Sequence, residues 1–94
     1  MRSQSIYKVP QGKLLKISVE YDEKEYRIKE IRITGDFFAY PEEALELMEI
    51  KLKHTVMEQE VLRDKISSII ATYHIEFIGL NAEGLARGIV MCRP

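Results

Sequence analysis

Near Thr34 the hydrophobic pattern of this chain changes, and no other feature constrains its fold as strongly. Before this point apolar and polar residues alternate, a pattern that predicts β-strands with one buried face. After it, apolar residues recur about every 3.6 positions, as they do in amphipathic helices. Strands that are separated from helices along the chain predict an α+β fold. Because 94 residues give room for one domain, we expect a single domain over residues 1–94.

The first third of the chain predicts a three-stranded antiparallel meander. The clearest strand runs from Leu15 to Tyr21, where every second residue is apolar. Asp22–Glu25 interrupts this alternation and is interpreted as a hairpin turn, although it lacks the Asn-Gly pair that favours the tightest turns. An earlier strand around Ile6 is expected to stop at Pro10, because proline cannot donate a hydrogen bond to a strand ladder.

In the return strand of this hairpin the alternation of apolar and polar residues is interrupted. Tyr26 and Ile28 occupy even-numbered positions, whereas Ile31 and Ile33 occupy odd-numbered ones. One extra residue in a strand resets the alternation, because two residues of the bulged strand then oppose one residue of its partner. We therefore expect a β-bulge near Lys29–Glu30, which would bring both apolar pairs to the same face of the sheet.

Three helices are expected after the strands. The first begins at Pro41, because proline is tolerated at the first helical position. The second begins at Thr55–Glu58, interpreted as a capping box in which the Thr hydroxyl and the Glu carboxylate bond each other's free amides. Asn81 caps the third, and His74–Leu80 before it is short and extended. The apolar stripes of the three helices are, in order, Ala44, Leu45, Met48 and Leu52; Leu62, Ile66, Ile69, Ile70 and Tyr73; Leu85, Ile89 and Val90.

Charge and hydropathy argue against nucleic-acid and membrane partners. The chain has 14 Lys and Arg against 15 Asp and Glu, whereas proteins that neutralise phosphates usually carry a basic excess. The longest uncharged run, Ile66–Ile75, is ten residues long and too short to span a bilayer. The basic N-terminal region contains no apolar segment of the kind found in signal peptides. We therefore expect a cytoplasmic location.

The use of cysteine and histidine predicts neither a disulfide nor a metal site. Cys92 is the single cysteine, so it has no partner for an internal disulfide or a thiolate cluster. His54 and His74 stand twenty residues apart and do not have the spacing of a zinc motif. No Ser-His-Asp, Cys-His or paired-carboxylate arrangement is evident, so the chain is expected to lack a complete active site.

Residues 35–41, Gly-Asp-Phe-Phe-Ala-Tyr-Pro, join the predicted sheet to the predicted helices and concentrate aromatic residues. Two interpretations remain open. The aromatic rings can plug the seam between sheet and helices, with Gly35 adopting a positive φ and Asp36 bonding nearby amides. The segment can also dock a partner or cover a ligand, because loops at the ends of elements carry sites disproportionately. The two interpretations are compatible.

Gly12-Lys13, at the start of the second strand, is a weaker candidate. A lysine after a glycine can place its ammonium beside a phosphate or a carboxylate, but the full P-loop pattern is missing. An exposed lysine at a strand end, with no binding role, is the favoured interpretation of this pair alone.

Two segments carry a resemblance to a known family. They are Gly12-Lys13-Leu14 and the run Ile33–Glu43, in which Gly-Asp-Phe-Phe is followed by two residues and Pro-Glu-Glu. Together with the turn Ile78–Leu80 before the last helix, they resemble the small accessory domain of lipoate-protein ligases, in particular the free-standing accessory subunit of two-subunit archaeal-type ligases. The resemblance covers nearly the whole chain. It implies three helices packed on one face of the meander, a fold similar to that of iron–sulfur scaffold (SufE/NifU-like) proteins.

The resemblance implies a supporting role in a ligase reaction. In this family the large catalytic subunit binds lipoate, ATP and Mg and makes lipoyl-adenylate, releasing pyrophosphate. It then transfers the lipoyl group to a lysine of an acceptor protein. The accessory subunit is needed mainly for the activation step, and in single-chain relatives this domain swings away once the adenylate has formed. The Arg- and Gly-rich signature of the large subunit is absent here, so this chain is expected to ligate nothing alone.

The same resemblance implies a heterodimer with the catalytic subunit, which would hold all cofactors and meet the lipoyl acceptors. No catalytic residue or metal ligand is expected in this chain. The expected partner- or ligand-facing residues are Gly12, Lys13, Gly35, Asp36, Phe37, Phe38, Tyr40 and Pro41. These residues would form a lid that orders the nucleotide loop of the catalytic subunit without donating a catalytic group.

Two other functions are alternatives to this one. An iron–sulfur or sulfur-transfer scaffold needs several thiolates or an exposed reactive cysteine, and Cys92 has no companion. A generic protein-interaction module unrelated to lipoate is the second alternative. An adenylation assay with the catalytic subunit distinguishes it from a ligase accessory subunit.

Overall fold

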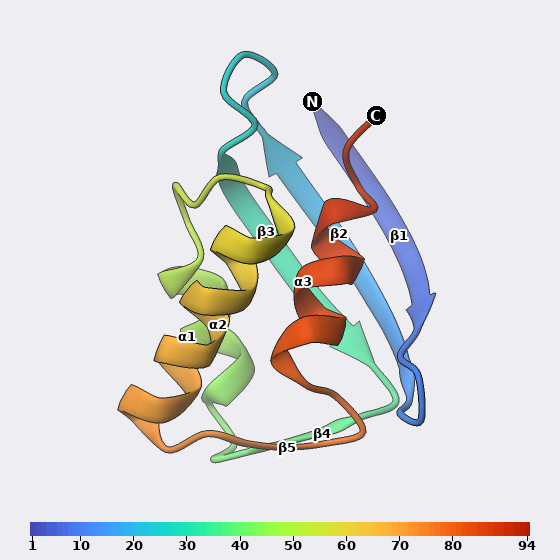
Figure 1. The fold of residues 1–94 in the computed structure, drawn as a ribbon, viewed down its shortest axis with the longest axis vertical. Helices are drawn as coiled ribbons and strands as arrows, with labels where there is room; N and C mark the ends of the chain where they lie inside the picture. The colour runs from blue at the N-terminus through green and yellow to red at the C-terminus, as the bar shows by residue number, and fades with distance from the viewer.

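The computed structural model describes residues 1–94 and contains a three-stranded sheet, a two-stranded ribbon and three helices (Figure 1). The elements are, in chain order, β1 (Arg2–Lys8), β2 (Leu14–Tyr21), β3 (Ile28–Gly35), β4 (Phe38–Tyr40), α1 (Ala44–Lys51), α2 (Gln59–Tyr73), β5 (Glu76–Ile78) and α3 (Ala82–Val90). Both termini lie at one end of the molecule, and the β4–β5 ribbon lies at the opposite end (Figure 1). The predicted α+β fold is confirmed.

The strands β1, β2 and β3 form the predicted antiparallel meander, with β2 in the centre. Between β2 and β3, Glu20 pairs with Glu30 while Tyr21 pairs with Ile28, so Lys29 is the extra residue of a bulge. The bulge resets the alternation of β3. As a result Ile28, Ile31 and Ile33 are all buried, together with Leu15, Ile17, Val19 and Tyr21 of β2. The predicted bulge is confirmed.

The helices lie on one side of the sheet, with α3 over β1 and β2, α1 beside β3, and α2 packed on α3 (Figure 1). The approach of α3 is close because it presents a glycine to the sheet. A Cβ atom on Gly88 would lie 2.6 Å from Leu15 Cδ2. The Ser5 hydroxyl donates a hydrogen bond of 2.7 Å to the Gly88 carbonyl oxygen, which fixes α3 against β1.

The core between sheet and helices is apolar throughout, and no polar or charged side chain is buried. The predicted stripes contribute Ala44, Met48 and Leu52 from α1 and the turn after it, Leu62, Ile66 and Ile69 from α2, and Leu85 and Ile89 from α3. Tyr73, at the end of the α2 stripe, is exposed instead, and the Lys51 ammonium lies 5.6 Å from the centre of its ring. None of the helices combines the length and the apolar composition needed to cross a bilayer.

The start of α1 differs from the prediction. The helix begins at Ala44 rather than at Pro41. Residues 41–43 form a turn instead, because β4 ends at Tyr40 and the chain must reverse before it can pack beside β3. The first helical hydrogen bond runs from the Leu47 N–H to the Glu43 carbonyl oxygen at 3.0 Å.

The start of α2 also differs, because the predicted capping box at Thr55–Glu58 does not form. The backbone of residues 55–57 pairs with the hairpin end of the sheet instead. The Ile28 N–H donates to the Thr55 carbonyl oxygen at 3.0 Å, and the Met57 N–H donates to the Tyr26 carbonyl oxygen at 2.8 Å. These tertiary bonds hold the segment outside the helix, so α2 begins at Gln59 without a side-chain cap. The predicted Asn81 cap of α3 is confirmed by a 2.7 Å bond from the Gly84 N–H to Asn81 Oδ1.

The ribbon of β4 and β5 is an element that the sequence did not predict as such. The sequence predicts that residues 74–80 are extended, but it does not predict that β5 pairs with residues 38–40. In this antiparallel pair Phe38 lies opposite Ile78, Ala39 opposite Phe77, and Tyr40 opposite Glu76. Two of the eight predicted site residues, Phe38 and Tyr40, lie in this ribbon.

Candidate functional site

Three segments that are distant in sequence meet at the base of the ribbon. The Lys13 N–H donates a hydrogen bond of 2.8 Å to the Gly79 carbonyl oxygen. The Asp36 N–H donates one of 3.0 Å to the Leu14 carbonyl oxygen. The start of β2, the end of β3 and the end of β5 are therefore connected by backbone hydrogen bonds, and the two motifs singled out in the sequence are neighbours in space.

Glycine is required at this crossing because the backbones approach closely. Gly79 has φ +88°, and a Cβ there would lie 2.5 Å from Lys13 Cγ. A Cβ on Gly12 would lie 2.6 Å from the Gly79 carbonyl oxygen, and one on Gly35 would clash with the Leu14 carbonyl oxygen. Gly12 and Gly35 thus serve the geometry of the crossing.

The two adjacent phenylalanines have different roles. Phe37 is buried, and its ring packs edge-on against Phe77 with 6.2 Å between ring centres and an interplanar angle of 82°. Such edge-to-face pairs stabilise more than their buried area alone. Phe37 therefore plugs the seam between the ribbon and the rest of the core. Phe38 lies on the other face of the ribbon and points away from the core.

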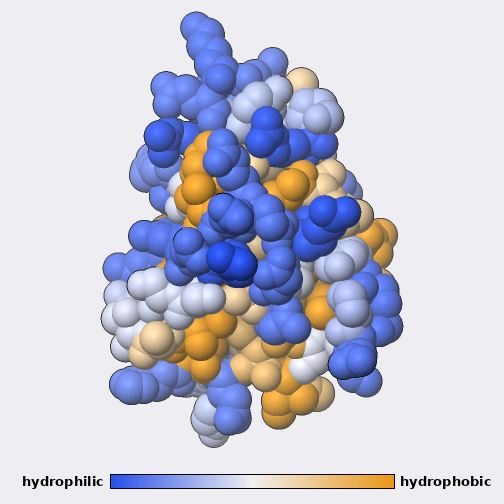
Figure 2. All heavy atoms as spheres, in the orientation of Figure 1, coloured by the Kyte–Doolittle hydropathy of each residue, from blue (hydrophilic) through white to orange (hydrophobic).

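The outer face of the ribbon presents three large apolar side chains to solvent. Phe38 is 70% exposed, Tyr40 is 74% exposed and Ile78 is 61% exposed. They share one face because Phe38 and Ile78 are direct cross-strand neighbours, and Tyr40 is two residues along the same strand. We call these three residues the ribbon patch. In Figure 2 hydrophobic residues reach the surface at the end of the molecule where Figure 1 places the ribbon.

Ile78 and Glu76 belong to this face but were missed as site residues. The sequence indicates that their segment is extended and apolar. The sequence of a strand of three residues does not, however, indicate which other strand it pairs with. The alternation of Glu76, Phe77 and Ile78 is the one signal that could have indicated a strand with one exposed face.

Lys13 and Asp36, the two charged residues among the predicted set, are both exposed. Neither side chain is engaged in an ion pair within the chain. Both are therefore available to an external group. Pro41, the remaining predicted residue, follows a cis peptide bond in the turn after β4 and is half-buried.

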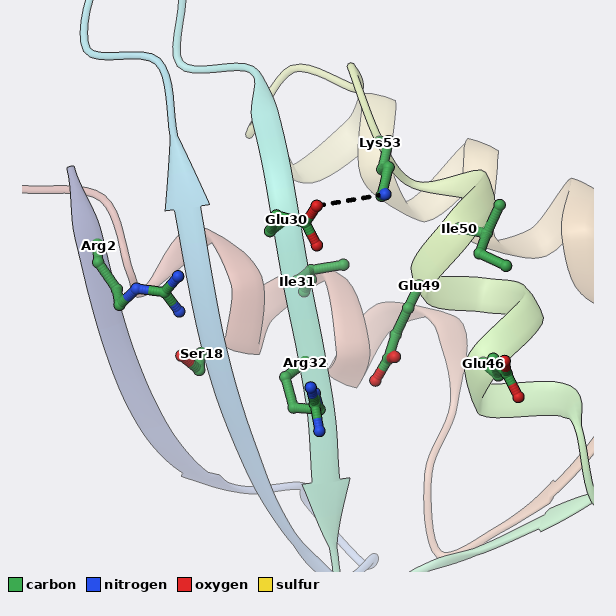
Figure 3. Close-up of a pocket in the computed structure, with 9 residues that line it drawn as sticks. All are labelled: Arg2, Ser18, Glu30, Ile31, Arg32, Glu46, Glu49, Ile50 and Lys53. Carbon is green, nitrogen blue, oxygen red and sulfur yellow. Dashed lines mark ion pairs between the residues drawn. The ribbon is translucent and has the colours of Figure 1, made fainter.

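A separate hollow of about 340 Å³ lies between α1 and the sheet (Figure 3). Its charged groups connect α1 to the edge strand. The Glu49 carboxylate accepts a hydrogen bond of 2.8 Å from the Ile33 N–H. Figure 3 shows the ion pair in which the Lys53 ammonium lies 3.4 Å from a Glu30 carboxylate oxygen. These groups hold the edge of β3, and we assign the hollow a structural role.

The two side chains with shifted pKa values lie outside the ribbon. Asp22, at the tip of the β2–β3 hairpin, has a lowered pKa because the Lys24 N–H and the Glu25 N–H donate to its carboxylate. Burial raises the pKa of the Cys92 thiol, which is 3% exposed. Sulfur-transfer chemistry needs an accessible thiolate, so the burial of Cys92 argues against such a role. No group of three His, Cys, Asp or Glu side chains is arranged to hold a metal ion.

Comparison with known proteins finds a similar fold among solved structures. No family model and no curated protein sequence matches this chain. Among solved structures, the fold is similar to a chain from an archaeal lipoylation system of Thermoplasma acidophilum, a bi-partite lipoate protein ligase with its E2 lipoyl domain. The TM-score is 0.78, the sequence identity is 26%, and the alignment covers 95% of this chain and 94% of that chain.

The comparison confirms the resemblance that Gly12-Lys13-Leu14 and the run Ile33–Glu43 indicated, and it does so over almost the entire fold. The similarity to iron–sulfur scaffold proteins remains a prediction. This chain is a structural relative, along nearly its whole length, of a component of a bi-partite lipoate protein ligase system.

Proposed function

We propose that this protein is the accessory subunit of a two-subunit lipoate-protein ligase. It would act in a heterodimer with a separate catalytic subunit during the ATP-dependent activation of lipoate to lipoyl-adenylate. The lipoyl group would then pass to a lysine of an acceptor protein. The observation that carries this proposal is the match of the whole fold to a component of a bi-partite lipoate protein ligase system, with 95% and 94% of the two chains aligned.

The division of labour follows from the chemistry of adenylation. The lipoate carboxylate must be held in line with the α-phosphate of ATP while water is excluded. We assign lipoate, ATP and Mg to the catalytic subunit, and acceptor proteins would contact this chain only through that subunit. We place the complex in the cytoplasm. The contribution of this chain would be to order the nucleotide loop of its partner, as lids do in other enzymes.

Within this chain, Lys13 is the residue best placed to reach a phosphate or a carboxylate of the complex. Its backbone is fixed by the hydrogen bond to Gly79, while its ammonium group is free. A Lys13→Ala subunit is expected to support lipoate activation less well than the wild type. Lys65→Ala, at an exposed position in α2, is the matched control and should have no effect. Normal activation by the Lys13→Ala subunit would exclude this role for the lysine.

A bypass experiment tests the proposed step. With lipoate and ATP as substrates, lipoylation of an acceptor domain should require both subunits. With preformed lipoyl-adenylate, the catalytic subunit alone should lipoylate the acceptor. An equal requirement for this chain in both reactions would contradict a role confined to activation.

A further inference from the structure

We propose that the ribbon patch docks into an apolar depression with a basic margin on the catalytic subunit; this inference rests on the function proposed above. The patch consists of Phe38, Tyr40 and Ile78, each more than 60% exposed. Exposed aromatic side chains grouped on one face are typical of the energetic centre of protein interfaces. The rest of the ribbon explains why this face is suited to docking.

The ribbon presents the patch on a rigid support. Its inner face is anchored by Ala39 and Phe77, which pack against the core, and by the contact between Phe77 and Phe37. Its base is fixed by the backbone bond between Lys13 and Gly79. A docking surface that is already ordered loses little conformational freedom on binding, so more of its contact energy appears as affinity.

The charges around the patch specify the kind of surface that fits it. Residues 35–43 and 75–80 contain four carboxylates and no Lys or Arg, and Lys13 lies beside Gly79, at the end of the ribbon away from Tyr40. Three of them, Glu42, Glu43 and Glu76, lie at the Tyr40 end of the ribbon, where Glu76 is the direct cross-strand neighbour of Tyr40. None of the four is in an ion pair within the chain. Opposite charges across an interface accelerate association, so the partner surface should carry Lys or Arg opposite Tyr40.

The same charges argue against a second copy of this chain as the occupant. Two-fold packing of the patch on itself would bring two sets of unpaired carboxylates together, and juxtaposed like charges oppose association. The patch therefore fits a surface of complementary charge better than it fits itself.

Affinity measurements with single variants test the apolar part of the proposal. The dissociation constant of the complex with the purified catalytic subunit is expected to rise at least about tenfold for Phe38→Ser and for Ile78→Ser. Ile6→Ser is the matched control, because Ile6 is 65% exposed on a β-strand that is not part of the ribbon. It should bind like the wild type. Circular dichroism and thermal unfolding check that each variant is folded.

The salt dependence of association tests the charge part. Raising ionic strength should slow association of the wild-type chain, and the triple variant Glu42→Gln, Glu43→Gln, Glu76→Gln should associate more slowly at low salt with a weaker salt dependence. Glu60→Gln, at an exposed position in α2, should leave both quantities unchanged. If the triple variant associates like the wild type, the inference that the partner surface has a basic margin is wrong.

The outcomes separate this inference from the proposed function. If the complex forms and the ribbon variants bind as tightly as the wild type, the docking site is elsewhere and the accessory function stands. If the chain alone forms a dimer that Phe38→Ser disrupts, the patch belongs to a second copy and the inference is wrong. If the wild-type chain neither binds nor stimulates the catalytic subunit, the proposed function is wrong, and the docking inference that rests on it is wrong as well.

Discussion

Lys13 and Gly79 cross so closely that the Lys13 N–H donates to the Gly79 carbonyl oxygen at 2.8 Å, while Lys13 Cγ lies 2.5 Å from the position of a Cβ on Gly79. This crossing connects the start of β2 to the end of the ribbon. It explains why a Gly-Lys pair and a Gly-Leu turn, separated by more than sixty residues, contribute to one structural unit.

The close approach of Lys13 and Gly79 predicts that adding a methyl group to Gly79 destabilises the protein. Gly79→Ala should lower the free energy of unfolding by about 1–3 kcal/mol, because it combines a positive φ with a clash against Lys13. Denaturant unfolding measures this loss. In the double variant Lys13→Ala, Gly79→Ala the clash with Cγ is removed, so part of the stability should return. Strict additivity of the two single effects would show that the contact carries no strain.

The hydrogen bond between Glu49 and the edge strand predicts a second stability effect. The Glu49 carboxylate accepts from the Ile33 N–H, and its removal leaves that donor without a protein partner. Glu49→Ala should cost about 1–2 kcal/mol of unfolding free energy. Glu46→Ala, one helical turn earlier and exposed, is the control and should cost only a few tenths of a kcal/mol. Equal losses in the two variants would contradict the assigned role of Glu49.

The two helix starts should respond differently to cap removal. Asn81→Ala removes the acceptor of the Gly84 N–H and should destabilise the protein by about 1 kcal/mol. Thr55→Ala should cost clearly less, because the Thr55 hydroxyl makes no capping bond to α2. Thermal unfolding of the two variants compares them directly. A larger loss for Thr55→Ala would restore the capping-box interpretation.

The burial of Cys92 predicts a protected thiol and a dependence of stability on alkaline pH. Its pKa is raised by burial, so the folded state favours the protonated thiol and the stabilising contribution is complete below the pKa of the unfolded thiol. This contribution should be lost as pH rises through the higher folded pKa. The difference in unfolding free energy between wild type and Cys92→Ala should therefore shrink at alkaline pH.

A thiol reagent at neutral pH provides an independent check on Cys92. Modification of the native protein should be slow and limited by opening of the structure, whereas the denatured protein should react at once. Rapid modification of the native protein would show that the thiol is accessible, and it would reopen the sulfur-transfer alternative.

The sequence predicted the meander well because strand alternation is a local signal. The parity break between Ile28 and Ile31 located the bulge to within one residue, since a buried face admits only one phase of the alternation. The Asn81 cap was also predictable, because the cap and its acceptor bond lie within four residues of chain.

The errors arose where tertiary contacts override a local pattern. The Thr55–Glu58 pattern is a good helix start in isolation, but the backbone of residues 55–57 is used by the sheet hairpin. The pairing of β4 with β5 joins residues that lie 36 to 40 positions apart, so no local pattern encodes it. For the same reason the sequence placed Phe37 and Phe38 in one site, whereas the ribbon turns one inward and the other outward.

Lipoate-dependent pyrophosphate release tests the central claim most directly. The purified catalytic subunit would be assayed with lipoate, ATP and Mg, with and without this protein. Release is expected only when both chains are present, and it should rise with added accessory chain until the heterodimer saturates. Full release by the catalytic subunit alone, together with no binding of this chain, would contradict the proposed function.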